Sequence, residues 1–201
     1  MKKLLSAVLL GLWLFTSTGS MQTKGTVPEW LDRISRSVVA LRNESGKFFC
    51  SGFVIRQDTI QTAYHCLMSS GEELKVDGKQ VAILYADPKL DSATLGVPTG
   101  GRKALRPAVN QPLPGQVVYS IGHAAGQKRL TTTYGGVREV QGKYLITDPI
   151  VIAGMSGGPV LNKDGEVVGM NHMSFSREFH ESDYALNIKL LRERNRSLWE
   201  F

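Results

Sequence analysis

Residues 154–159 read Gly-Met-Ser-Gly-Gly-Pro, and this stretch carries the strongest indication of fold and chemistry in the chain. A nucleophilic serine needs an exposed hydroxyl and nearby backbone N–H groups that point at a developing oxyanion. Glycines around Ser156 allow the tight backbone turn that aims such donors, because they lack a Cβ atom. Taken alone, the stretch is equally consistent with a glycine-rich loop, so a catalytic interpretation needs partners elsewhere in the chain.

Two further segments offer those partners. Residues 62–66 read Thr-Ala-Tyr-His-Cys and end an apolar strand with His65, next to one of the two cysteines in the sequence. A disulfide between Cys50 and Cys66 would tie the turn that bears His65 to the preceding strand, which favours a catalytic histidine over a structural one. Asp91 precedes the alternating run Ser-Ala-Thr-Leu and is a candidate carboxylate, although Asp87 is a rival and either one is also suited to capping a turn.

The N-terminus is typical of a secretory signal. Lys2 and Lys3 are followed by an apolar run over 4–15 and by small and polar residues over 16–20. A run of this length is shorter than the roughly 20 residues that cross a bilayer, so we predict a signal peptide over 1–20 and a mature chain over 21–201. The alternative is an uncleaved anchor. In an exported protein the cysteine pair is expected to be oxidised.

The charge of the chain is mildly basic, with a formal net charge of +6 at pH 7. The pairs Arg102-Lys103 and Lys128-Arg129 lie apart and have no interleaved aromatic residues. We therefore interpret them as solvated loop charges rather than a nucleic-acid surface, with only a weak bias toward acidic partners. The histidines show no metal-ligand spacing, and neither a metal nor another cofactor is expected.

Many short β-rich runs at regular spacing predict an all-β fold. They fall into two halves, over about 37–97 and 116–188, joined by a linker rich in Gly and Pro over 98–115. We expect two six-stranded antiparallel barrels, a short amphipathic helix over 28–37 and a C-terminal helix over 189–201.

These motifs resemble those of the trypsin-like (chymotrypsin-fold) serine peptidases, in particular short bacterial members related to the HtrA proteases and glutamyl endopeptidases. Residues 62–66 resemble the family's Thr-Ala-Ala-His-Cys, residues 91–95 resemble Asp-x-Ala-x-Leu, and residues 154–159 resemble Gly-Asp/Asn-Ser-Gly-Gly-Pro. The order His, Asp, Ser also fits this group. The resemblance favours Asp91 over Asp87. Only 45 residues follow Ser156, too few to add the PDZ domain of HtrA proteases.

The resemblance implies a catalytic triad in which Ser156 is the nucleophile, His65 the general base and Asp91 the residue that orients it. The backbone N–H groups of Gly154 and Ser156 would form the oxyanion hole. The implied protein is a monomeric, secreted or periplasmic serine endopeptidase that cleaves protein or peptide substrates through an acyl-enzyme, without stable membrane insertion or nucleic-acid binding.

The sequence departs from trypsin around the nucleophile. Ile150 stands where trypsin has its specificity Asp, so cleavage after Lys or Arg is not expected. We predict a mainly apolar substrate pocket for small or medium side chains, formed by four residues: Ile150, Ile152, Asn171 and Met173. His172 lies one position beyond the His of glutamyl endopeptidases, and strand alternation directs it away from the pocket, toward Asp91. Met155 replaces the Asp that trypsin pairs with its new N-terminus, so no such activation is expected.

Two other functions remain open from the sequence. A trypsin-fold protein without turnover would act as a binding or inhibitory module, and the departures at Met155 and Tyr64 are compatible with that. The other hypothesis is a structural or host-interaction protein of the cell envelope, and the basic C-terminal tail is its only support in the sequence.

Overall fold

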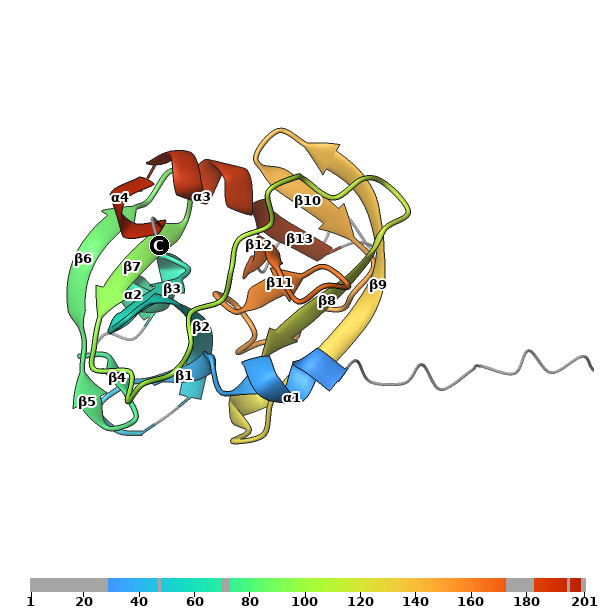
Figure 1. Ribbon diagram of the computed structural model, residues 1–201. Coiled ribbons are helices and arrows are strands. Elements are labelled where there is room, and N and C mark those ends of the chain that lie inside the picture. Colours follow the sequence, from blue (N-terminus) through green and yellow to red (C-terminus); the bar gives the residue numbers. More distant parts are fainter. Residues whose placement is uncertain (1–28, 47, 70–72, 173–182, 195, 200–201) are drawn as a thin grey trace, which may run out of the picture.

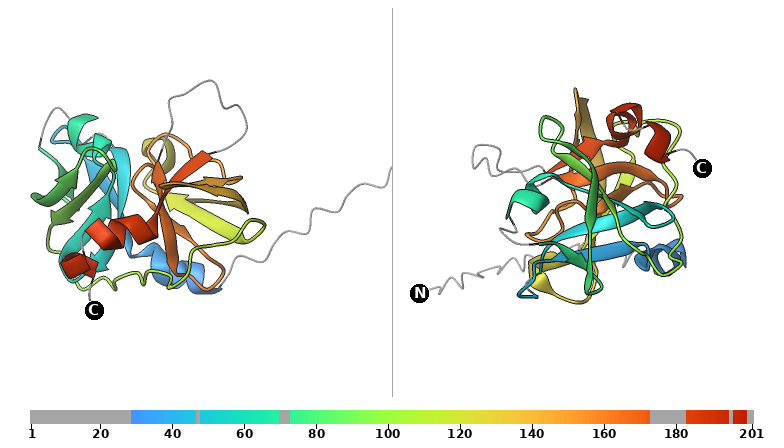
Figure 2. Two further views of the ribbon diagram at one scale, coloured as in Figure 1. Left: turned by 90° about the horizontal axis from the view of Figure 1, so that it is seen from above. Right: turned by 90° about the vertical axis from the view of Figure 1, so that its left-hand side faces the viewer.

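The computed structural model describes residues 29–46, 48–69, 73–172, 183–194 and 196–199. The chain forms two β-rich halves that lie side by side, with helices at the two ends of the junction between them (Figures 1 and 2). The predicted all-β fold in two halves is confirmed. None of the described helices is long and apolar enough to cross a membrane.

The first half is a seven-stranded antiparallel sheet in the order β5-β4-β1-β2-β3-β7-β6. Its strands are β1 (Val38–Arg42), β2 (Phe48–Arg56), β3 (Thr59–Thr62), β4 (Lys75–Val76), β5 (Lys79–Gln80), β6 (Ala82–Asp87) and β7 (Ser92–Gly96). Among the described residues no ladder joins β5 to β6, so this half is an open, curved sheet rather than the closed six-stranded barrel we expected. The additional strands β4 and β5 are two residues each, too short to show a period in the sequence.

The turn between β4 and β5 explains how so short a hairpin forms. Asp77 and Gly78 both have a positive φ, 51° and 76°, as the two central residues of a type I′ turn require. The backbone twist of such a turn matches that of the flanking strands.

The second half is a closed barrel in the order β10-β13-β12-β11-β8-β9, as expected. Its strands are β8 (Val117–Gly122), β9 (Thr131–Gln141), β10 (Tyr144–Thr147), β11 (Pro159–Leu161), β12 (Val167–His172) and β13 (Asp183–Asn187). Closure leaves no free sheet edge on this half, because every strand is paired on both sides.

Helices cover the ends of the junction between the halves. Helix α1 (Glu29–Ser35) packs Trp30, Leu31 and Ile34 against the core, and the Trp30 indole donates a hydrogen bond to the Lys163 carbonyl at 2.7 Å. At the opposite end lie α3 (Ile188–Arg194) and α4 (Arg196–Trp199) (Figure 1). Their packing needs an apolar face, which the sequence pattern had indicated for the first helix.

One hydrophobic core joins the two halves. It includes Phe53 and Ile60 of the first half and Ile121, Met170 and Leu186 of the second, all of them fully buried. Trp199 of α4 reaches across to Phe53, with ring centroids 6.2 Å apart. Because the halves share this core, residues at their junction are held in a fixed relation to each other.

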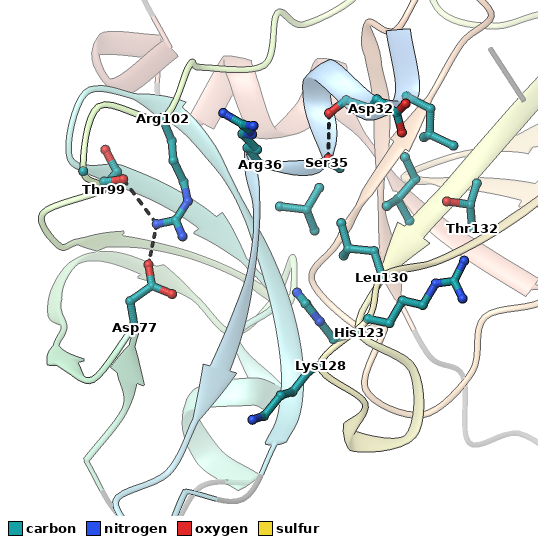
Figure 3. A pocket seen from close by; sticks show the side chains of 15 residues that line it. Asp32, Ser35, Arg36, Asp77, Thr99, Arg102, His123, Lys128, Leu130 and Thr132 are labelled. Atoms are coloured by element: carbon teal, nitrogen blue, oxygen red, sulfur yellow. Dashed lines mark hydrogen bonds and ion pairs between the residues drawn. The ribbon is translucent and has the colours of Figure 1, made fainter. Parts of the chain in front are cut away.

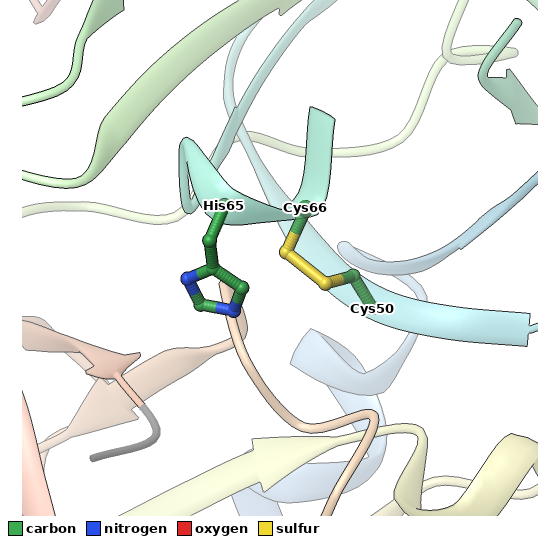
Figure 4. A group of neighbouring side chains, drawn as sticks. All are labelled: Cys50, His65 and Cys66. Carbon is green, nitrogen blue, oxygen red and sulfur yellow. A yellow bond between two sulfur atoms is a disulfide. The ribbon is translucent and has the colours of Figure 1, made fainter. Parts of the chain in front are cut away.

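A disulfide links Cys50 of β2 to Cys66 of the short helix α2 (His65–Ser69) (Figure 4). This bond was predicted from the sequence and is confirmed. It closes a loop of 16 residues. The bond therefore ties α2, which begins at His65, to the centre of the sheet.

Removing the disulfide in the double variant Cys50→Ala/Cys66→Ala is expected to lower the free energy of unfolding by about 3 kcal/mol, because the unfolded chain regains the freedom that the closed loop denies it. Urea denaturation of the oxidised wild type and the variant measures the difference. The reduced wild type should match the variant; equal midpoints for oxidised and reduced protein would contradict the prediction.

Candidate active site

The segment around Ser156 is built from two successive tight turns. In the first, the Met155 N–H donates to the Ile152 carbonyl at 2.9 Å, and Gly154 in its third position has a φ of 94°. In the second, the Gly158 N–H donates to the Met155 carbonyl at 2.9 Å, and Gly157 has a φ of 80°. A positive φ at the third position is the requirement of type II turns, which explains why glycine stands at both places.

The same glycines also allow close backbone packing. A Cβ atom on Gly157 would lie 2.4 Å from the Ser51 carbonyl oxygen, and one on Gly158 would lie 2.1 Å from the Ile121 carbonyl oxygen. Only glycine fits at either position. The nucleophile segment is therefore pressed against β2 of one half and β8 of the other, where no larger residue can replace a glycine without moving the backbone.

Ser156 itself is almost completely buried, with 2% of its surface exposed. Its hydroxyl makes no hydrogen bond to any described residue, His65 included. The sequence led us to expect an exposed hydroxyl; the two tight turns and their packing enclose it instead. A buried polar group without a partner is costly, and such groups in native proteins call for a functional or solvent explanation.

Two backbone donors lie in the segment that carries this hydroxyl. Among the described residues, neither the Gly154 N–H nor the Ser156 N–H has a hydrogen-bond acceptor. The intervening Met155 N–H, in contrast, is used within the first turn. Two unbonded N–H groups that flank a serine in this way are free to bind an oxygen of another molecule.

His65 and Asp91 are in direct contact. The Asp91 carboxylate accepts the His65 backbone N–H on Oδ1 and bonds the His65 Nδ1 through Oδ2, each at 2.7 Å. His172 adds a third contact, from its Nδ1 to the same Oδ2 at 2.6 Å, as strand alternation had predicted. The Tyr144 ring stacks on His172 with a centroid distance of 5.5 Å, which holds that imidazole in place.

The backbone at Asp91 adopts a left-handed conformation, with φ at 51°. Asp tolerates this region better than most residues, and here it turns the carboxylate toward α2. The rival residue Asp87 has a different use, because its Oδ1 accepts the backbone N–H groups of Lys89 and Leu90 at 2.9 and 3.1 Å. Asp87 caps the turn that leads to Asp91 and does not contact His65.

Opposing effects act on the pKa of Asp91. Burial alone would raise it, but the hydrogen bonds from His172 and His65 and the attraction of His65 together hold the pKa well below its ordinary value. An ionised carboxylate only accepts hydrogen bonds, so both imidazoles must carry a proton on Nδ1. In neutral His65, the lone pair is therefore on Nε2, the nitrogen that faces away from Asp91.

The backbone brings Ser156 to the same place. Its carbonyl oxygen accepts the Ser51 N–H at 2.8 Å and lies 3.9 Å from the sulfur of Cys66, the residue after His65. Gly157 donates to the Asn171 carbonyl at 2.8 Å, and Asn171 directly precedes His172. The structure thus brings the candidate nucleophile, base and carboxylate together at the junction of the two halves.

Ser51 supports the nucleophile segment, and sequence reasoning missed it. Its hydroxyl donates to the Gly154 carbonyl at 2.7 Å and accepts the His123 N–H at 2.8 Å. Its own carbonyl accepts the Thr62 hydroxyl at 2.7 Å. Ser51 is fully buried and fixes the first turn of the nucleophile segment. A lone serine in a strand gives no sequence signal for this role.

The residues predicted to line the substrate pocket are placed differently from one another. Ile150 and Ile152 are 64% and 38% exposed on the segment before Ser156. Asn171 is fully buried, and its amide nitrogen donates to the carbonyls of Ile121 and Met155 at 3.1 and 3.3 Å, so it supports the nucleophile turns. Met173 lies outside the described residues.

One group of side chains has the donor set of a metal site. Nitrogen or oxygen atoms of His65, Asp91 and His172 lie within 4.8 Å of one another. Their Nδ1 to Oδ2 distances of 2.6 and 2.7 Å are hydrogen-bond lengths, whereas two ligands of a tetrahedral zinc ion stand roughly 3.3 Å apart. The cluster as folded fits a shared carboxylate better than a resident ion.

A comparison with protein families agrees with this geometry. The model of the trypsin-like peptidase domain matches residues 50–170, a range that contains His65, Asp91 and Ser156. The chain belongs to the trypsin-like peptidase domain family.

The chain is similar to several curated proteins. It is 32% identical over 150 residues to a protein of Halomonas elongata named "Probable periplasmic serine endoprotease DegP-like". It is 30% identical over 139 residues to serine protease HTRA1 of Xenopus laevis. These matches cover 67% and 60% of the chain but only 31% and 30% of the relatives. The chain therefore spans about a third of the length of the curated relatives it matches.

Solved structures share the fold. The serine endoprotease from Yersinia pestis matches with a TM-score of 0.72 and 25% identity, over 84% of this chain and 65% of that one. The active form of the Rv3671c protease from M. tuberculosis matches with a TM-score of 0.74 and 22% identity, over 87% of this chain and 86% of that one. The arrangement of two β halves is that of these proteases.

Proposed function

We propose that this protein is a serine endopeptidase in which Ser156 is the nucleophile, His65 the general base and Asp91 the orienting carboxylate. The observation that carries the proposal is the pairing of His65 Nδ1 with an ionised Asp91 beside a serine whose hydroxyl and flanking N–H groups are unbonded. The family membership and the names of the relatives support the same reaction.

The mechanism follows from these positions. Ser156 Oγ attacks the carbonyl carbon of the scissile bond while its proton passes to Nε2 of His65. The N–H groups of Gly154 and Ser156 stabilise the oxyanion, and Asp91 stabilises the imidazolium. His65 then returns the proton to the departing amine as the C–N bond breaks. A water molecule, deprotonated by His65, hydrolyses the acyl-enzyme and regenerates the Ser156 hydroxyl.

Covalent labelling tests the proposal. A fluorophosphonate should react with the oxidised wild-type protein, and mass spectrometry of the peptides should place the adduct on Ser156. Acid unfolding before labelling is the control, because an adduct that survives unfolding does not depend on the site. A folded, oxidised protein that fails to react would favour the alternative function, a trypsin-fold binding or inhibitory module.

We propose that cleavage occurs after small or medium uncharged residues. Ile150 and Ile152 present apolar side chains near the nucleophile, and a Lys or Arg side chain would find no carboxylate at the position of Ile150. Profiling against a peptide library is expected to give products that end in apolar residues. Dominant cleavage after Glu, Lys or Arg would overturn this preference without affecting the proposed triad.

We propose that the protein acts outside the cytoplasm, in the periplasm or as a secreted monomer. The support is the periplasmic description of the DegP-like relatives and the disulfide, a bond that persists in oxidising compartments. The predicted location outside the cytoplasm also rests on the signal segment over 1–20. That segment lies outside the described residues. The buried Met155, packed against Ala124 and Val151, needs no charged partner, which supports a site formed without N-terminal activation.

Replacing Ser51 by alanine is expected to lower kcat about 10²–10³-fold with little change in KM, the cost of losing one oxyanion donor. The reason is that the Gly154 carbonyl and the His123 N–H would both lose their partner, so the first turn is no longer fixed. Steady-state kinetics on a peptide substrate measures kcat and KM separately.

The matched control for Ser51 is Thr94→Ala. Thr94 is equally buried, and its hydroxyl donates to Gln61 at 3.1 Å and not to the nucleophile turns. It should lower the free energy of unfolding by about 1 kcal/mol while kcat stays unchanged. Equal losses of kcat in the two variants would show that Ser51 acts only through stability.

A further inference from the structure

A groove of about 1120 Å³ lies between the two halves, away from the residues assigned to catalysis. It is bordered by α1 and its connection to β1, by the linker around Arg102, and by the loop that follows β8 (Figure 3). Figure 3 shows the side chains of Arg36, Arg102, His123 and Lys128 around this space, on those three segments. None of His65, Asp91 and Ser156 lines it.

The groove and the two hollows continuous with it concentrate positive charge. Their described lining contains seven basic and two acidic residues, an excess of five positive charges. The basic residues are Arg33, Arg36, Arg42, Arg102, Lys103, Lys128 and Arg129, and the acidic ones are Asp32 and Asp77. The pairs at 102–103 and 128–129, interpreted from the sequence as separate solvated charges, thus meet at one surface.

Three of these basic side chains have no carboxylate partner among the described residues. Asp77 is engaged by the Arg102 guanidinium. Arg36, Lys128 and Arg129 are exposed, and within the described part of the chain no carboxylate forms an ion pair with any of them. Like charges gathered at a concave surface repel one another, and an anionic ligand relieves that repulsion.

The floor of the groove decides which kind of anion fits. Its apolar lining is aliphatic, formed by Leu31, Val38, Ile121 and Leu130, and His123 is the one aromatic ring in the described lining. Single-stranded nucleic acids bind to grooves where aromatic side chains stack on the bases, whereas a peptide can offer carboxylates to the rim and aliphatic side chains to the floor. We propose that this groove is an exosite that docks an acidic peptide segment carrying aliphatic residues, supplied by a protein partner.

The exosite is joined to the nucleophile segment by backbone contacts. The loop that displays Lys128 and Arg129 begins at His123, whose N–H is held by Ser51, the residue that also holds Gly154. Ala125 in the same loop donates to the Ala153 carbonyl at 2.6 Å. A docked segment therefore lies against the loop that supports the oxyanion turn, and His65, Asp91 and Ser156 do not line the groove that it fills.

Fluorescence anisotropy with the Ser156→Ala protein tests docking without turnover, so its outcome does not depend on the proposed reaction. The probe is a fluorescein-labelled dodecapeptide of Glu, Leu and Gly, and a peptide in which Lys replaces Glu serves as the charge control. The Glu peptide is expected to bind, more weakly in high salt, and the Lys peptide is not. Absence of binding by the Glu peptide at low salt would overturn the proposal.

Charge reversal locates the binding site. Arg36→Glu/Arg129→Glu is expected to weaken binding about tenfold, the effect of losing two partly exposed ion pairs and adding repulsion. The matched control, Arg56→Glu/Arg106→Glu, alters two exposed arginines outside the groove and changes the net charge equally, so it should leave the Kd nearly unchanged. Equal weakening in both variants would overturn the proposal.

Two further measurements test whether the variants are folded and whether the groove prefers nucleic acid. Circular dichroism checks that the variants are folded. If the charge-reversal variant proves unstable, the milder variant Lys128→Gln/Arg129→Gln replaces it, because it adds no negative charge. This variant should weaken binding about threefold. A twelve-nucleotide deoxythymidine strand should bind more weakly than the Glu peptide at equal salt. Tighter binding by the oligonucleotide would assign the groove to nucleic acid instead.

Discussion

Ser156→Ala is expected to lower kcat for a peptide substrate by about 10⁵–10⁶-fold and to leave KM within a few-fold of the wild-type value. Without the hydroxyl no acyl-enzyme forms, and what remains is the stabilisation that the oxyanion donors give to direct attack by water. The variant should also be more stable than the wild type, by about 1 kcal/mol, because it lacks a buried hydroxyl that has no hydrogen-bond partner. Kinetics and urea denaturation measure the two effects.

Ser120→Ala is the matched control for this prediction. Ser120 lies on β8, is fully buried and also has a hydroxyl without a partner among the described residues. Its replacement should give a similar gain in stability and no change in kcat. If Ser156→Ala kept more than a hundredth of the wild-type turnover, the assignment of the nucleophile would be wrong, whatever its effect on stability.

The tight turns around Ser156 were predictable because the sequence pattern is local there, whereas the burial of its hydroxyl was not. The glycines at 154, 157 and 158 stand where a positive φ or a close backbone approach requires them. The direction of His172 toward Asp91 followed from the two-residue period of a strand. The disulfide followed from two cysteines in a chain with a predicted export signal. Each of these inferences needed only neighbouring residues or a simple count.

What could not be predicted depends on contacts between distant segments. Ser51 meets Gly154 and His123 only because β2 packs against the second half. Asn171 was expected in the pocket, but its amide turns to the carbonyls of Ile121 and Met155, since buried carbonyls need donors. The basic exosite joins arginines of three separate segments, and no sequence window contains them together.

Asp91→Asn is the second change expected to have a large effect, lowering kcat about 10⁴-fold. Asp91 Oδ2 accepts hydrogen bonds from both imidazoles, from His65 Nδ1 at 2.7 Å and from His172 Nδ1 at 2.6 Å. An amide has a single acceptor oxygen, so it cannot accept the His65 backbone N–H and the two imidazoles together. With its oxygen on the backbone N–H, its NH₂ group faces the imidazoles. His65 would then change its tautomer, with the proton on Nε2, and could no longer accept the proton of Ser156. Measurement of kcat and KM for the variant checks this, and KM should change little.

Asp87→Asn is the control, because Asp87 only caps a turn through the N–H groups of Lys89 and Leu90. It should keep kcat and lose at most about 1 kcal/mol of stability. Stability against pH gives an independent readout. The pKa of Asp91 is lowered by folding, so its ionised form stabilises the protein above the unfolded value near pH 4, and this contribution is lost as the pH falls below it. The stability difference between wild type and Asp91→Asn should therefore shrink below about pH 4. A pH-independent difference, or an equal loss of kcat in Asp87→Asn, would contradict the role of Asp91.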